Sequence, residues 1–264
     1  MVICPVCTGA LQKTEGCWKC LNGHSFDVAR QGYVNLLTVD RKHSLHPGDT
    51  RQMVASRKAF LDAGYYAPIA DLLRQLLAQY SPKTVLDVGC GEGYYLTSAA
   101  PEDCEAWGLD ISKDAVRYAA VRNKNANWVV GTASHLPFSH ESFDCLVSMF
   151  ALTEPGEFFR VLKPEGVFLQ VTAHPEHLMG LKRIIYPEII HKEKDLNPEY
   201  PGFRLEDTRL LEFEFTAEGA DMVGNLLSMT PHFWRIGKEG AERAAATEQL
   251  RDTARVIFRI YRKE

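Results

Sequence analysis

The sequence predicts an α/β protein: a mostly parallel sheet with helices on both faces, preceded by a small, β-rich, metal-binding module. Three observations predict it. From residue 84 onwards, short apolar strands alternate with helical patterns, which is typical of a parallel sheet built from strand–helix–strand units. Three closely spaced glycines follow the first of these strands. Four of the seven cysteines lie within the first twenty residues.

Composition limits the classes of protein to consider. The chain has 264 residues, of which 45% are hydrophobic, so it can bury a substantial core. It has no long apolar run that would span a membrane and no signal-peptide pattern at its start, so we expect a cytoplasmic protein without a membrane partner. The net charge is −4, but residues 1–60 hold eight Lys or Arg and four acids, giving +4 there and −8 in the rest. This asymmetry indicates either a polyanionic partner or chance.

The pattern divides the chain into three parts. Residues 1–37 are rich in cysteine, glycine and turn formers and predict a compact unit of short strands. Residues 38–80 predict a linker around Pro47-Gly48-Asp49, followed by amphipathic helices at 51–64 and 66–79. Residues 81–264 predict the sheet domain.

Within the sheet domain, apolar runs and helical periodicity alternate. The expected strands are 84–88, 106–110, 128–131, 143–150, 167–173, 210–216 and 255–261, and the expected helices are 92–100, 112–123, 157–162 and 218–228. The 157–162 helix is expected to end at the turn Lys163-Pro164-Glu165-Gly166.

The glycine loop predicts a nucleoside site. Gly89, Gly91 and Gly93 stand between a strand and a helix, and Asp87 lies two residues before the first of them. Glycines allow positive φ and let a ligand approach the backbone. The spacing G-x-G-x-G resembles motif I of class I methyltransferases, which have a Rossmann-like fold and use S-adenosylmethionine. A nicotinamide or flavin site, or a purely structural turn, is the lesser alternative.

Two acids accompany this loop. Asp110 ends the next strand, about twenty residues on, where a carboxylate can accept both hydroxyls of a ribose. It supports nucleoside binding without choosing between donors. Asp87 either bonds the loop backbone, orients the methionine end of the donor, or is structural.

The cysteine cluster predicts a closed tetrahedral zinc site, which is structural rather than catalytic. Cys4 and Cys7 form one C-x-x-C pair. The other two ligands are either Cys17 with Cys20, or Cys20 with His24. Clustered cysteines in a reducing compartment favour a metal over disulfides.

With both parts together, the chain resembles the bacterial 23S ribosomal RNA guanine-N1 methyltransferase family over most of its length. The resemblance is carried by the cysteine cluster with His24-Ser25-Phe26-Asp27, Gly32 to Leu37, Pro47-Gly48-Asp49, Arg57 to Gly64, Asp87 to Tyr95, Leu136-Pro137-Phe138, His177-Leu178-Met179 with Leu181-Lys182, and Met229-Thr230-Pro231. The end of the zinc module and the segment from Arg57 to Gly64 are the more specific of these.

The resemblance implies that Cys4, Cys7, Cys20 and His24 bind the zinc. It also implies that Tyr66, Gly91, Glu92 and His177 line the donor pocket beside Asp87, Gly89, Gly93 and Asp110. It implies a homodimer whose zinc modules help grip a hairpin of 23S ribosomal RNA. Cys17 departs from the family pattern, and so does segment 139–156, which shapes the acceptor pocket in many methyltransferases.

The expected reaction is methylation of guanine N1, which also requires loss of the N1 proton. His135, Glu154 and His177 are possible general bases by position only, and no catalytic residue is assigned. Lys19, Arg30, Arg41, Lys42 and Lys182 are candidates for phosphate contacts. Phe233 and Trp234 either stack on a base or, as the sequence favours, pack inside. The alternative functions are a small-molecule methyltransferase and a catalytically inactive RNA-binding module.

Overall fold

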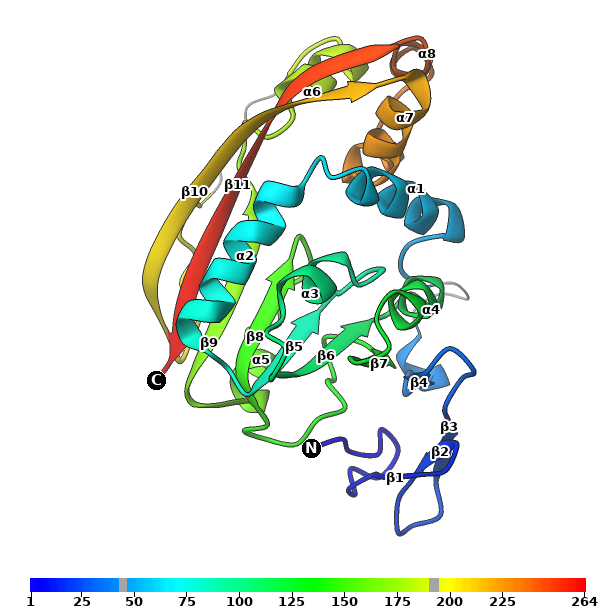
Figure 1. Ribbon diagram of the computed structural model, residues 1–264, viewed down its shortest axis with the longest axis vertical. Coiled ribbons are helices and arrows are strands. Elements are labelled where there is room, and N and C mark those ends of the chain that lie inside the picture. The colour runs from blue at the N-terminus through cyan, green and yellow to red at the C-terminus, as the bar shows by residue number, and fades with distance from the viewer. Residues whose placement is uncertain (43–46, 190–194) are drawn as a thin grey trace.

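The computed structural model describes residues 1–42, 47–189 and 195–264. An eight-stranded sheet runs through the molecule, with a cap of helices at one end and a small cysteine-rich module at the other (Figure 1). None of the described helices has both the length and the apolar character needed to cross a bilayer.

The strand order of the main sheet is β10-β11-β9-β8-β5-β6-β7-β4. Its bounds are β4 Tyr33–Asn35, β5 Thr84–Val88, β6 Glu105–Asp110, β7 Asn127–Val130, β8 Phe143–Met149, β9 Leu162–Ala173, β10 Phe203–Glu218 and β11 Gln249–Lys263. The strands from β9 to β4 pair in parallel, while β11 pairs antiparallel with β9 and β10. Because β5 has β6 on one side and β8 on the other, the direction of winding reverses at β5, which is where open α/β sheets bind ligands.

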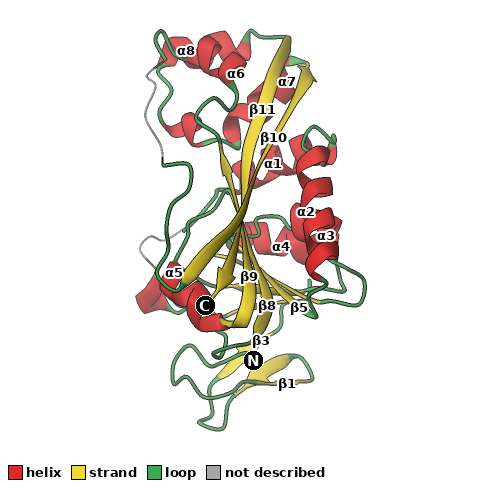
Figure 2. Cartoon of the chain, turned by 90° about the vertical axis from the view of Figure 1, so that its left-hand side faces the viewer, coloured by secondary structure: helices red, strands yellow, loops and turns green. Residues whose placement is uncertain are grey.

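Helices cover both faces of this sheet (Figures 1 and 2). One face packs against α2 Ala67–Tyr80, α3 Tyr94–Ala99 and α4 Lys113–Arg122, and the other against α5 Pro155–Val161 and the cysteine-rich module. Helix α1, Arg51–Asp62, begins at Thr50, whose hydroxyl accepts the N–H of Met53. Its packing against α7 links the parallel core to the cap.

Strands β10 and β11 form a long antiparallel ribbon that extends beyond the parallel strands (Figure 1). The cap at its far end contains α6 Met179–Ile185, α7 Ala220–Ser228, the 3-10 turn η2 Pro231–Trp234 and α8 Lys238–Ala245. Asp252 on β11 accepts the N–H groups of Gly180 and Leu181, so it ties the start of α6 to the ribbon.

The N-terminal module consists of three short antiparallel strands, β1 Gln12–Thr14, β2 Cys17–Lys19 and β3 Ser25–Asp27, with a 3-10 turn η1 Val39–Arg41 after it. It is fixed to the sheet domain at several points. The N–H of Ile3 bonds the carbonyl of Pro137 at 2.9 Å, and Trp18 packs edge-on against Trp107. Strand β4, which the sequence grouped with this module, lies beside β7 in the main sheet.

The expected helices and strands of the parallel core are confirmed, with small shifts at their ends. Three predictions need correction. The turn expected at residues 163–166 belongs to β9, which begins at Leu162. The two final strands are more than twice as long as expected, at 16 and 15 residues. Helices α6 and α8 had no counterpart in the sequence prediction.

Candidate donor site and metal centre

The glycine loop lies at the carboxyl end of β5 and leads into α3. All three glycines have positive φ, from 55° to 80°. A Cβ on Gly89 would lie 2.4 Å from Cβ of Ala151, and one on Gly93 would lie 2.7 Å from Cη2 of Trp128. Packing therefore requires glycine at both positions. A Cβ on Gly91 would have, among the described residues other than its chain neighbours, a single atom within 4 Å, Nη1 of Arg57 at 3.8 Å, so the middle of the loop is open.

Asp110 holds this loop in shape. Its Oδ2 accepts the N–H of Gly91 at 2.9 Å and its Oδ1 accepts the N–H of Ser112 at 2.8 Å. Burial raises the pKa of the Asp110 carboxyl, whereas the two N–H groups and the nearby Arg57 guanidinium lower it. Each carboxylate oxygen keeps a second lone pair, which can accept a ribose hydroxyl.

Asp87, near the end of β5, is buried, with 1% of its surface exposed. Burial raises its pKa to about 8, and the charges of Asp110 and Glu92 add to the effect. Within the described residues, its Oδ1 has no hydrogen-bond partner. Buried polar atoms are nearly always paired, so a bound polar ligand is the natural partner here. The open loop and this unpaired oxygen together fit an adenosyl donor.

Tyr66 and His177 form a hydrogen-bonded pair. The Oη of Tyr66 lies 3.2 Å from Nε2 of His177, whose Nδ1 accepts the N–H of Arg255 at 3.1 Å. This bond places the imidazole proton on Nε2. Burial lowers the pKa of His177 to about 3 and raises that of Tyr66. His177 is therefore neutral and a poor general base, although the sequence offered it as one.

Glu92 is also buried, and burial raises its pKa while Arg122 lowers it. Its side chain lies 3.4 Å from Nη2 of Arg122, and Arg122 forms a second ion pair with Asp62 of α1 at 2.7 Å. The side chain of Glu92 thus anchors α4 to the loop. Contact of Glu92 with the donor stays a prediction.

Sequence reasoning missed two further side chains at this site, Asp49 and Arg57. They form an ion pair across the loop from Gly91, and the Oγ of Ser112 donates to the carbonyl of Asp49 at 2.9 Å. The segment from Arg57 to Gly64 is one of the more specific parts of the family resemblance, so it marked Arg57 as a residue of interest. It did not indicate that Arg57 lies at the glycine loop. The other two candidate bases are His135, in the loop after β7 and bonded to Ser134, and Glu154, at the N-terminus of α5. A role as general base stays a prediction for both.

Four ligands converge in the N-terminal module. One ligand atom from each of Cys4, Cys7, Cys20 and His24 lies within 4.8 Å of the others. The Sγ atoms of Cys7 and Cys20 are 3.7 Å apart, and Nδ1 of His24 lies 3.4 and 3.6 Å from Sγ of Cys20 and Cys4. A zinc ion with Zn–S bonds of about 2.3 Å and Zn–N bonds of about 2.0 Å has tetrahedral edges of about 3.8 and 3.5 Å, so the ion fits.

The pKa values of these thiols respond to the local backbone. The pKa of Cys7 is lowered to about 6, chiefly by a backbone hydrogen bond from Gly9, whereas burial raises that of Cys4. Cys17 is outside the cluster, with its Sγ 3.0 Å from Oγ1 of Thr14. The geometry therefore favours His24 over Cys17 as the fourth ligand.

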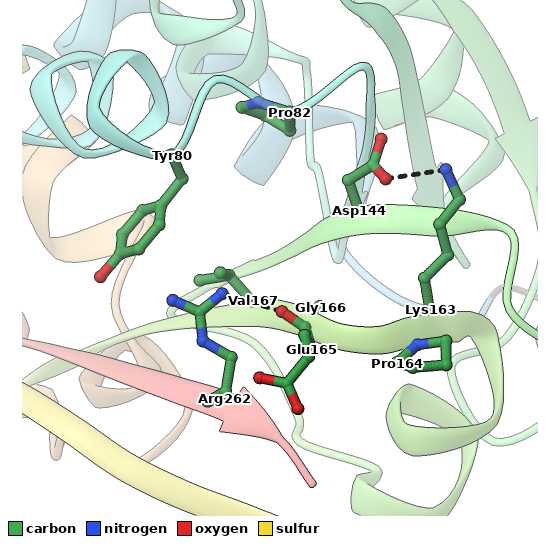
Figure 3. Close-up of a pocket in the computed structure, with 9 residues that line it drawn as sticks. All are labelled: Tyr80, Pro82, Asp144, Lys163, Pro164, Glu165, Gly166, Val167 and Arg262. Carbon is green, nitrogen blue, oxygen red and sulfur yellow. Dashed lines mark hydrogen bonds and ion pairs between the residues drawn. The ribbon is translucent and has the colours of Figure 1, made fainter.

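A separate cavity of about 190 Å³ opens at the opposite, amino ends of the parallel strands (Figure 3). Three of its charged side chains, Asp144, Lys163 and Arg262, are already paired. Asp144 accepts Nζ of Lys163 at 2.7 Å, and Arg262 donates to the carbonyl of Glu165 and to Glu206. Ligands of parallel α/β sheets bind at the carboxyl ends, so we assign no role to this cavity.

The sheet order, the glycine loop and Asp110 define a class I, S-adenosylmethionine-dependent methyltransferase. A family model described as "Methyltransferase domain" matches residues 85–166, and one described as "RlmA, N-terminal", a zinc ribbon, matches residues 2–45. The cofactors are therefore S-adenosylmethionine and a structural zinc ion.

The more particular relationship comes from whole-length similarity. The chain is 35% identical to the "23S rRNA (guanine(748)-N(1))-methyltransferase" of Streptomyces fradiae, over 88% of this chain and 85% of the relative. It is 33% identical, over 98% and 96% of the two chains, to a Micromonospora griseorubida protein provisionally named a 23S rRNA (guanine-N(1)-)-methyltransferase. The chain belongs to this family. The solved YcgJ protein of Bacillus subtilis is 18% identical over 73% of this chain and 97% of that chain, with a TM-score of 0.45.

Proposed function

We propose that this protein transfers the methyl group of S-adenosylmethionine to N1 of a guanine in a hairpin loop of 23S ribosomal RNA. The observation that carries the proposal is the combination of the open loop at Gly91, held by Asp110, with a zinc module fixed to the same sheet. A small-molecule methyltransferase would not need that module. The intact donor loop argues against an inactive RNA-binding protein.

Methyl transfer mainly requires that the donor and the acceptor base are aligned. The methyl group on the sulfonium is already activated, so the site has to place the acceptor nitrogen in line with the methyl carbon and sulfur. Asp110 would hold the ribose, the backbone around Gly91 would lie against the donor, and Tyr66 with His177 would lie at its methionine end. Guanine N1 is on the Watson–Crick edge, so the base must be unpaired when it reacts.

Transfer of labelled methyl groups to unmodified 23S rRNA, followed by primer extension, tests the proposal. A methyl group on N1 blocks pairing, so reverse transcription should stop one nucleotide before a single guanine. Donor binding without incorporation into rRNA would contradict the proposal, and incorporation into a small acceptor instead would favour the alternative enzyme.

Donor affinity is expected to depend on Asp87. The donor carries a positive sulfonium, so it binds best when Asp87 is ionised, and that fraction rises as the pH passes through about 8. The Kd measured by calorimetry should therefore fall between about pH 6 and pH 9. The donor's own α-amino group titrates in the same range. In Asp87→Asn, the pH dependence of the donor Kd comes from the α-amino group alone. If the wild type and Asp87→Asn had the same pH dependence, Asp87 would not bind the sulfonium as a carboxylate.

Phe233 and Trp234 are both exposed, at 40% and 67%, so the packing role that the sequence favoured is wrong. They follow His232, which bonds the hydroxyl of Tyr186 at 2.8 Å. Base stacking on them is expected to quench Trp234 fluorescence when an unmodified rRNA hairpin is added. Trp234→Ala should weaken RNA binding about tenfold. Trp234→Phe should remove the quenching but keep most of the affinity, and unchanged binding by Trp234→Ala would contradict stacking.

Contacts with phosphates and the homodimer stay proposals. Lys19, Arg30 and Lys42 are exposed and available for phosphates, whereas Nζ of Lys182 donates to the carbonyl of Pro175. The family resemblance supports a homodimer whose zinc modules together hold the RNA hairpin. It also supports a cytoplasmic location. Sedimentation equilibrium of the full chain, with and without RNA, tests the dimer.

A further inference from the structure

An exposed aromatic ring stands at the mouth of the donor site. Phe150 follows directly after β8 and is 42% exposed. Its ring lies nearly parallel to that of His177, at 28° and with centroids 6.5 Å apart, and 6.3 Å from the ring of Tyr95. Because His177 bonds Tyr66, one side of Phe150 faces the residues proposed to hold the methionine end of the donor.

The backbone holds this ring in an unfavourable conformation. Phe150 has φ of 55°, in the left-handed region that costs energy for any residue with a bulky side chain. Its N–H bonds the carbonyl of Val171 at 2.8 Å, and the next residue, Ala151, is wedged against Gly89. Strained backbone of this kind persists where the surroundings impose it, and it clusters at functional sites.

Position and chemistry together select the ligand. The acceptor must lie close to the methyl group of the donor, and the ring is at the carboxyl end of β8, beside the glycine loop. An aromatic ring holds a purine by its face and leaves the Watson–Crick edge free to react. His177 is neutral, since burial keeps its pKa low, so the ring beside Phe150 presents no charge to a base.

We propose that Phe150 is the stacking platform for the acceptor guanine, a substrate-binding residue fixed in place by the strained turn after β8. This inference rests on the proposed function and adds the residue that positions the target base. Phe233 and Trp234, on η2 of the cap, are a separate surface that would contact neighbouring bases.

Two substitutions at Phe150 and one control test the platform. Phe150→Leu keeps an apolar side chain but removes the ring, and Phe150→Tyr keeps the ring. Leu210→Ala is the control, because Leu210 lies on the edge strand β10, outside the turn after β8, and is also an exposed apolar side chain, at 57%. For each protein we would measure kcat and KM with an unmodified 23S rRNA hairpin transcript, and the Kd of S-adenosylmethionine by calorimetry.

The expected result is a kcat/KM for RNA about tenfold lower in Phe150→Leu, with an unchanged donor Kd. Phe150→Tyr should restore most of the loss, and Leu210→Ala should match the wild type. Wild-type kcat/KM in Phe150→Leu would overturn the platform and leave the proposed function standing. A matching rise in the donor Kd would also overturn it, because Phe150 would then belong to the donor pocket. Absence of RNA methylation by the wild type would overturn both proposals.

Discussion

Replacing Asp110 with asparagine is expected to raise the Kd of S-adenosylmethionine about 100-fold. The carboxylate accepts N–H groups with both oxygens, from Gly91 and from Ser112. An asparagine has one acceptor oxygen, so its NH₂ group would face one of these donors and leave it unpaired. The ribose would also lose its charged acceptor. These losses amount to about 3 kcal/mol, which corresponds to about 100-fold in affinity.

Calorimetry with the donor checks this prediction, and circular dichroism shows whether the variant folds. Asp103→Asn is a matched control. Asp103 forms an exposed ion pair with Lys83, and such pairs contribute little to stability. That control should bind the donor like the wild type. If Asp110→Asn also bound within about threefold of the wild type, the carboxylate would not hold the sugar.

The parallel core could be predicted because burial on both faces leaves its signature in the sequence. Strand β5 is buried at all five positions and reads as a short apolar run. The glycine loop was equally readable, since backbone conformation and close packing both demand glycine at Gly89 and Gly93. These constraints are local, so a single sequence carries them.

The ribbon and its cap are built from contacts between distant residues. Strand β10 alternates between exposed and partly buried positions over most of its length, so it offers no buried apolar face to recognise. Its pairing with β11 supplies the missing stability. Helix α6 begins where Asp252, about seventy residues away in sequence, accepts its first N–H groups. Because the capping residue is so distant, the sequence next to α6 carries no motif for the start of the helix.

In the donor site, too, local features could be predicted from the sequence and contacts between distant residues could not. The sequence identified Asp110 and the glycines from spacing, but the roles of Tyr66 and His177 came from family resemblance alone. Only the fold reveals that these two side chains bond each other, 111 positions apart in sequence. Spacing also left open the choice between Cys17 and His24, which depends on how the chain turns after β2.

Replacing Cys20 with serine is expected to remove the zinc and abolish methylation of rRNA while leaving donor binding intact. Serine is a poor zinc ligand, and three ligands hold the ion much more weakly than four. Strands β1 to β3 have three residues each and largely exposed side chains, so the module has little core of its own. Structural zinc contributes at least about 10 kcal/mol to such units, and its loss should unfold the module.

Cys17→Ser makes the same chemical change in the same module, but outside the cluster. It should keep about one zinc ion per chain and wild-type activity. Metal content, donor Kd and methyl transfer to rRNA are measured for both variants. Substitution is a cleaner test than deleting residues 1–37, because a deletion would also remove β4 from the main sheet. Zinc loss in Cys17→Ser but not in Cys20→Ser would refute the assigned ligands. An active, zinc-free Cys20→Ser would show that the module is dispensable for catalysis.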